Sequence, residues 1–191
     1  MLQYNRAVQG ARLSLLSALA AALGTVACGG LARDAPLTIQ PGLTRAQTID
    51  ALHDRAYCRP DGPPRVRELY PACNRPGAEY GQSWIAVEFR HDQLVRIQRF
   101  EHYDDDSLAV ERWNDLVRRH GDLGDASQHA REEMVRLRGL PDGTRSWFAF
   151  PRAGGSVLVG VYLLAPARPG EANVLEEVIP ADMTPTTGAD N

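Results

Sequence analysis

The hydrophobic positions of the chain form one long uninterrupted run near the start and then short stretches with helical or alternating spacing. The run covers residues 13–27 and holds no charged side chain, and Arg6 and Arg12 precede it. It is about 15 residues long, whereas a helix that spans a bilayer needs roughly 20. A short apolar run after a few basic residues is typical of a secretory signal peptide. We therefore expect residues 1–27 to be a signal peptide.

Two later stretches have helical spacing. Thr44 and Gln47 form a capping box before apolar residues spaced three to four apart, which predicts a helix over residues 44–57. Acidic residues at 104–106 precede a second such stretch, which ends at Gly121. Acids at the start and glycine at the end favour a second helix there.

Strand patterns follow each predicted helix. Apolar and polar residues alternate over residues 83–90 and return over 94–100, which predicts a hairpin. Residues 145–150 and 156–164 predict a second hairpin, and residues 174–179 an added edge strand. The pattern over residues 125–138 is ambiguous and fits a short helix followed by a strand or loop.

Residues 58–80 have no periodicity and hold five prolines, so we expect a loop with at most a helical turn at 66–70. Cys58 and Cys73 bracket its first part. In the oxidising compartment that a signal peptide implies, we expect them to form a disulfide. Two free thiols or a metal-binding pair are the alternatives, although a lone cysteine pair without a nearby histidine is poor zinc spacing.

These elements predict an α+β fold, with helices packed on one face of a small antiparallel sheet. The sequence SWIAV at residues 83–87 is similar to SWFAF at 146–150, so the chain reads as two tandem helix-plus-hairpin repeats or as one continuous sheet. The expected divisions are a signal peptide over 1–27, a tether over 28–40, a first repeat over 41–103, a second over 104–180 and a disordered tail over 181–191.

Composition narrows the range of functions. The 191 residues are 43% hydrophobic, which is enough for a core, and 21 basic against 24 acidic residues give a net charge of -3. Without a strong positive field we expect no nucleic-acid partner. Glycine-rich phosphate loops and the common hydrolase motifs are absent from the sequence. We therefore expect no catalytic residue, no metal and no cofactor.

The end of the apolar run suggests an anchor. Thr25, Val26, Ala27 and Cys28 resemble the lipobox of bacterial lipoproteins. That resemblance implies cleavage before Cys28, lipid on that cysteine and attachment to a membrane through the N-terminus. Gly29, in the place where an aspartate would retain a lipoprotein, implies the outer membrane, with the chain facing the periplasm. Ordinary cleavage after Ala27, which would release the chain, is the alternative.

The predicted first repeat resembles a known family. Gly42-Leu43-Thr44, Gln47 and Leu52, together with the strand that begins at Trp84, resemble the small outer-membrane assembly lipoproteins of the SmpA/OmlA, or BamE-like, type. The resemblance implies helices on a small antiparallel sheet and an envelope protein partner such as the barrel-insertion machinery. A doubled version also resembles beta-lactamase-inhibitor-type proteins, which bind another protein with the sheet.

We therefore expect a bacterial envelope lipoprotein that binds another protein or stabilises an outer-membrane assembly. The candidate partner-binding face is the first hairpin, with Trp84, Arg90, Arg96 and Arg99. One alternative is a secreted inhibitor or ligand-binding module that uses the outer face of the sheet. Another is a metal enzyme that uses His102 and the acidic residues 104–106, although acids there also fit a helix cap.

Overall fold

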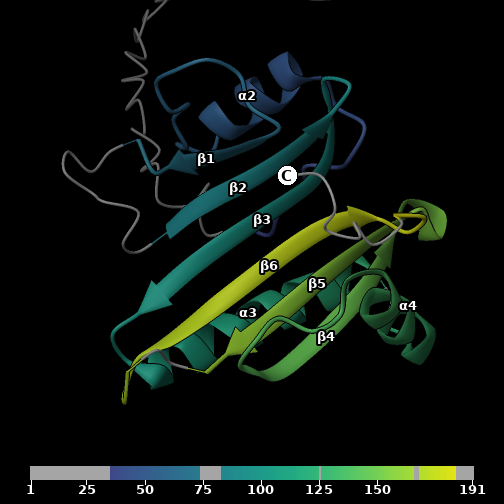
Figure 1. The fold of residues 1–191 in the computed structure, drawn as a ribbon. Helices are drawn as coiled ribbons and strands as arrows, with labels where there is room; N and C mark the ends of the chain where they lie inside the picture. The colour runs from purple at the N-terminus through teal and green to yellow at the C-terminus, as the bar shows by residue number, and fades with distance from the viewer. Residues whose placement is uncertain (1–34, 74–82, 125, 166–167, 184–191) are drawn as a thin grey trace, which may run out of the picture.

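The computed structural model describes residues 35–73, 83–124, 126–165 and 168–183, and it contains one six-stranded antiparallel sheet (Figure 1). The order of strands across the sheet is β1-β2-β3-β6-β5-β4. The strands are β1 (Arg67–Pro71), β2 (Ser83–Arg90), β3 (Gln93–Tyr103), β4 (Thr144–Arg152), β5 (Val157–Leu164) and β6 (Ala172–Pro180).

The sheet has two three-stranded halves that meet where β3 pairs with β6. Both predicted hairpins are confirmed as β2–β3 and β4–β5. β6 was expected at an edge, but it pairs with β3 on one side and β5 on the other. The similar sequences at 83–87 and 146–150 therefore do not occupy equivalent places, because β2 lies inside the sheet and β4 forms its edge.

The prediction of a loop or helical turn at residues 66–70 is wrong. Residues 67–71 form β1, which pairs with β2 and has alternating burial. The apolar alternation typical of a strand is broken here, because the buried position 68 is occupied by a charged residue, Glu68. Arg45 satisfies that charge, and the Tyr70 hydroxyl donates a hydrogen bond to it (2.6 Å).

Three helices pack on the sheet, which confirms the α+β class. They are α2 (Arg45–His53), α3 (Asp106–Leu123) and α4 (Gln128–Arg138). The side chains of Thr44, Asp105 and Ser127 cap their N-termini, and Thr44 makes the predicted capping box with Gln47. None of these helices is long and apolar enough to cross a membrane.

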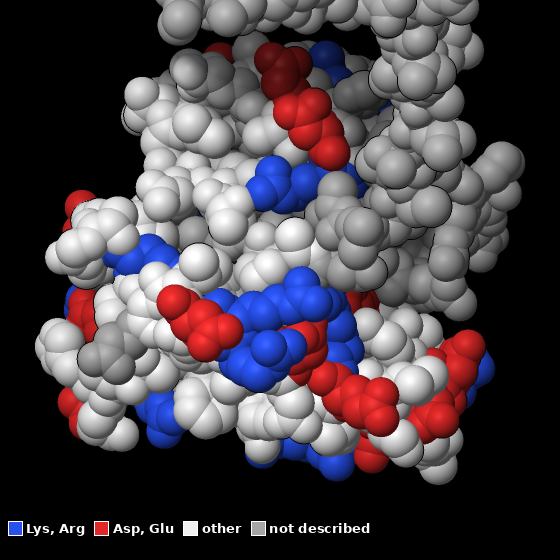
Figure 2. Space-filling model, turned by 180° about the vertical axis from the view of Figure 1, so that it is seen from behind, with Lys and Arg blue, Asp and Glu red and all other residues white. Residues whose placement is uncertain are grey.

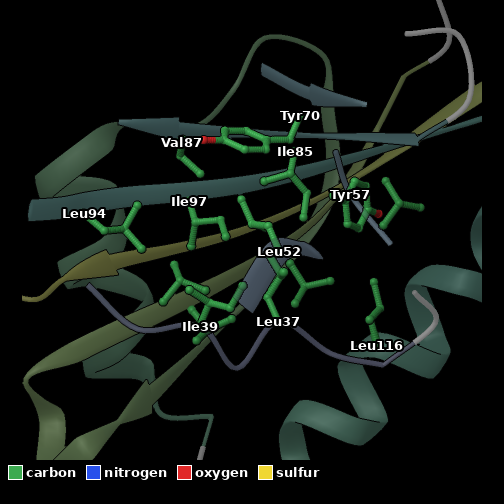
Figure 3. Packing of buried hydrophobic residues seen from close by; sticks show 14 of the residues in the cluster. Leu37, Ile39, Leu52, Tyr57, Tyr70, Ile85, Val87, Leu94, Ile97 and Leu116 are labelled. Atoms are coloured by element: carbon green, nitrogen blue, oxygen red, sulfur yellow. The ribbon is translucent and has the colours of Figure 1, made fainter. Parts of the chain in front are cut away.

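The helices occupy both faces of the sheet, although one face was expected. α2 and α3 pack on the first face, where Leu52 and Leu116 contact the large core cluster (Figure 3). α4 packs on the second face through Met134 and Leu137, against a separate cluster that includes Leu158. The short helix expected within residues 125–138 is confirmed as α4, but it continues to Arg138 where a strand or loop was expected.

The ends of the described chain are held more firmly than predicted. Leu37 and Ile39 are buried in the first-face core, so the tether expected over residues 28–40 does not extend that far (Figure 3). Met183 is buried in the second-face cluster, so residues 181–183 do not belong to a free tail. The predicted signal peptide, Cys28 and the remainder of the tail lie outside the described residues.

The predicted disulfide between Cys58 and Cys73 is confirmed. It joins the residue after Tyr57 to the residue after Ala72, and Tyr57 and Ala72 form an isolated antiparallel bridge. The segment between the two cysteines, which contains β1, is therefore fastened at both ends.

Candidate functional site

The first hairpin places three of the four predicted partner-binding residues on the second face of the sheet. Trp84, Arg90 and Arg96 lie on that side, and Arg90 and Arg96 both approach Glu88, at 3.5 and 3.7 Å. Arg99 lies on the opposite face and is buried, so its placement in a partner-binding face is wrong. A separation of three residues along a strand puts Arg96 and Arg99 on opposite faces.

The second face is covered by a helix over only one half of the sheet. On this face α4 packs against β4 and β5 (Figure 1). No helix of the described residues packs there on β1, β2 or β3. We call this uncovered half the open face; its residues are Arg67, Leu69, Trp84, Ala86, Glu88, Arg90, Arg96, Gln98, Phe100 and His102, of which Ala86 and Gln98 are buried. At its centre the rings of Trp84 and Phe100 stack, with centroids 4.0 Å apart.

A cavity of about 500 Å³ lies at the edge of the open face. Arg59, Arg65 and Arg67 surround it, and Leu69 and Trp84 form its apolar wall. We call it the arginine cavity. None of these three arginines forms a salt bridge with a described residue. Most of the other described arginines do have one.

The acids near the arginine cavity leave this positive charge largely uncompensated. Glu68 borders the cavity, but its carboxylate pairs with Arg45 and accepts hydrogen bonds from the Tyr70 hydroxyl and the Arg65 backbone N–H. Burial, together with that hydrogen bond to Glu68, raises the pKa of the Tyr70 hydroxyl, so the hydroxyl stays a donor. Asp61 is the second acid in the lining and is exposed.

The first face contains a buried charge network that the sequence analysis missed. Glu176 on β6 pairs with Arg99 on β3 and with His120 on α3, and each of the three side chains is 1% exposed. The Leu37 backbone N–H donates to Glu176 at 2.7 Å, and Arg99 donates to the Ala35 carbonyl oxygen at 2.8 Å. The network therefore fastens the segment before α2 to the centre of the sheet.

The hydrogen bonds of this network indicate which nitrogen of His120 donates and why Glu176 is ionised. Arg152 approaches His120 Nδ1 at 3.0 Å, and because a guanidinium can only donate, Nδ1 accepts this hydrogen bond and the Nε2–H donates one to Glu176. Burial alone would raise the pKa of Glu176, but the charge of Arg99 and the hydrogen bond from His120 hold it at about 2. Glu176 is therefore a fully engaged carboxylate, which gives it a structural role.

A second arginine completes the first-face network. Arg112 on α3 donates two hydrogen bonds to Glu101, at 2.7 and 2.8 Å, and Arg99 lies 3.2 Å from the same carboxylate. Burial opposes ionisation of Glu101, but these arginines hold its pKa below the usual value. Arg112 also reaches towards Asp115, which Arg118 and Arg119 contact as well. Figure 2 shows this side of the molecule, where blue and red side chains are interleaved.

The second face has its own buried acid, Glu177. It pairs with Arg138 of α4 and accepts a hydrogen bond from Gln98 at 2.8 Å. Glu176 and Glu177 are adjacent in an otherwise apolar strand, so each points to a different face and needs a partner there. Two acids inside the run VLEEVI were the signal that could have predicted these networks.

The predicted metal candidates are separated by the fold. Asp105 caps α3, and Asp106 pairs with Arg145 on β4. His102 and Asp104 do come together, 3.3 Å apart, with Glu171, the residue before β6, beside them. Asp104 is 81% exposed, and His102 is also hydrogen-bonded to Asn173 at 2.9 Å. These side chains meet at the end of the sheet, where His102 is half-buried and Asp104 is open to solvent.

Comparisons with known proteins identify no relative. No protein-family model matches the chain, and searches of curated proteins and of solved structures find no similar protein. The resemblance to the BamE-like lipoproteins therefore stays a prediction from short motifs.

Proposed function

We propose that this chain is a lipid-anchored protein of the bacterial cell envelope that works by binding another protein and not by catalysis. Cys28 carries the lipid in this proposal and holds the chain at the outer membrane, facing the periplasm. The lipobox-like residues before Cys28 support it, and so does the disulfide, because disulfides persist in oxidising compartments.

The observation that carries the binding role is the open face. No described helix packs on the other half of this face, and its larger apolar and aromatic side chains are half-buried there. Here these are Trp84, Phe100 and Leu69, with Arg90 and Arg96 beside them. Aromatic and arginine side chains are enriched at protein interfaces and often dominate the binding energy.

The buried acids support a structural reading of the charged groups. Glu176 and Glu177 lie at the centre of the sheet. Glu176 forms a salt bridge with Arg99, and Glu177 forms one with Arg138. His120, the histidine that meets a carboxylate in the interior, is 1% exposed. A general acid or base has to reach its substrate directly or through one water.

Two experiments test the proposal. Replacing Cys28 with Ala removes the lipid acceptor, so we expect the chain to move from the membrane fraction to the soluble fraction. A chain that stays in the membrane fraction would contradict the anchor. For the binding role, a photo-crosslinking residue at Arg90 on the open face should capture an envelope protein, whereas the same residue at exposed Arg118 on α3 should not. Equal capture at both positions would refute the assignment of the face.

A ligand-binding module is the second candidate, and the arginine cavity favours it. A cavity of about 500 Å³ lies within the range of small-molecule sites, which is about 300 to 1,000 Å³. An apolar wall with a few polar groups at the rim is also typical of such sites.

A further inference from the structure

We infer that the arginine cavity binds a phosphorylated sugar, with the phosphate held by Arg59, Arg65 and Arg67 and the sugar ring against Trp84. This inference depends on the second candidate function, a ligand-binding module, and does not require a protein partner. It identifies the class of ligand from the charge and size of the cavity and from Trp84 in its lining.

The charge of the cavity indicates a doubly negative group. Three arginines line it, and among the described lining residues Asp61 is the one acid that has no salt bridge. The remaining positive charge is about two, which matches a phosphate monoester at neutral pH, with about -1.5 to -2. Glu88 lies opposite Arg67 in the strand register, but it is drawn to Arg90 and Arg96. Arg67 is therefore left for a ligand.

Arginine is also suited to this group by its geometry. Its planar guanidinium presents paired N–H donors that match two phosphate oxygens at once. Arg67 lies on β1, while Arg59 and Arg65 lie on the segment before it, so two parts of the chain supply the three arginines that line the cavity. A phosphate between them would accept several charge-assisted hydrogen bonds.

The apolar wall accounts for the sugar ring. Trp84 is braced from one side by the Phe100 ring, so it presents a fixed aromatic surface. Leu69 lies beside it in the lining. A pyranose ring carries patches of C–H groups that pack on such a surface, and the cavity has room for a ring as well as a phosphate.

The disulfide helps to keep the site formed before a ligand arrives. Cys58 and Cys73 close a segment that contains all three arginines, and β1 pairs along its length with β2. Less conformational freedom is then lost when the ligand binds, which favours affinity.

Titration calorimetry on the purified full chain tests the inference, with glucose 6-phosphate as the probe. We expect saturable binding of glucose 6-phosphate and at least about tenfold weaker binding of glucose, inorganic phosphate and glucuronate, because each lacks the ring, the phosphate or the second charge. The double substitution Arg59→Gln/Arg67→Gln should weaken binding by at least about tenfold. The matched control Arg118→Gln/Arg119→Gln on α3 should leave it unchanged.

Several results would overturn the inference. One is the absence of saturable heat with glucose 6-phosphate. Another is binding of inorganic phosphate or glucuronate as tight as that of glucose 6-phosphate. The third is an unchanged affinity in the Arg59→Gln/Arg67→Gln variant. If a poly-glutamate peptide binds while glucose 6-phosphate does not, the cavity belongs to a protein interface instead. Circular dichroism of the variants separates lost binding from lost folding. Failure here leaves the cross-linking test at Arg90 unaffected, so the two proposals are judged separately.

Discussion

The buried pair of Arg99 and Glu176 gives the most direct test of how this sheet is held together. Arg99→Met removes the cation and keeps much of the side-chain length, so that Glu176 stays buried beside His120 without its main counter-charge. Breaking one side of a buried ion pair costs about 3–5 kcal/mol. The lowered pKa of Glu176 agrees in direction, because Arg99 is the largest of the interactions that oppose the effect of burial on this carboxylate.

Urea denaturation, followed by circular dichroism at pH 7, measures this cost. We expect Arg99→Met to lower the free energy of unfolding by about 3–5 kcal/mol. The double variant Arg99→Met/Glu176→Met should recover part of the loss, since no uncompensated charge remains in the core. As a control, Arg145→Met breaks the exposed pair with Asp106 and should cost less than about 1 kcal/mol.

The same carboxylate predicts a pH dependence. Its pKa is lower in the folded chain than in the unfolded chain, so its stabilisation is complete above about pH 4.5 and is lost as the pH falls towards 2. Glu176→Gln should therefore lose less stability than the parent chain over this interval. The reasoning is refuted if Arg99→Met costs less than about 1 kcal/mol, or if the double variant is destabilised by the sum of both single losses.

Three further predictions concern the fold. Replacing Cys58 and Cys73 with Ser should lower the free energy of unfolding by about 3 kcal/mol, and a reducing agent should have the same effect on the parent chain but none on the variant; equal denaturation midpoints would contradict this. Leu116→Ala empties a fully buried place under α3 and should cost about 2–5 kcal/mol in urea denaturation, a prediction that fails below about 1 kcal/mol. Thr44→Ala removes the cap of α2 and should cost about 1 kcal/mol, with Thr44→Ser as a control that keeps the hydroxyl and most of the stability.

The elements that the sequence predicted are those with local causes. The capping box at Thr44 marks the start of one helix, and the acids before Ser107 mark the start of another. Each signal lies within a few residues of the helix that it starts. The alternation in residues 83–90 likewise follows from the pleat of one strand. Such signals need no knowledge of what lies across the sheet.

The missed features depend on partners far along the chain. Strand β1 was hidden because Glu68 becomes acceptable in the interior only when Arg45 and Tyr70 reach it. The central place of β6 depends on pairing with β3, about 80 residues earlier, which no local pattern encodes.

The candidate site was predicted in part for the same reason. Trp84, Arg90 and Arg96 were placed on one surface, and the structure brings them together on the open face. Arg99 was added to them although strand alternation puts it on the other side. The arginine cavity was not foreseen, because Arg59 and Arg65 approach Trp84 only through the folding of the proline-rich segment.

The junction between β3 and β6 also determines how this protein can fold. Arg99 and Glu176 are 77 residues apart, and the two halves of the sheet are joined through the strands that carry them. Contacts between distant parts of a chain form slowly, because a long loop must close before they contribute. During synthesis, the first half emerges with β3 as an open edge until β6 follows. A chain that ends before residue 172 should therefore be prone to aggregation and to attack by proteases.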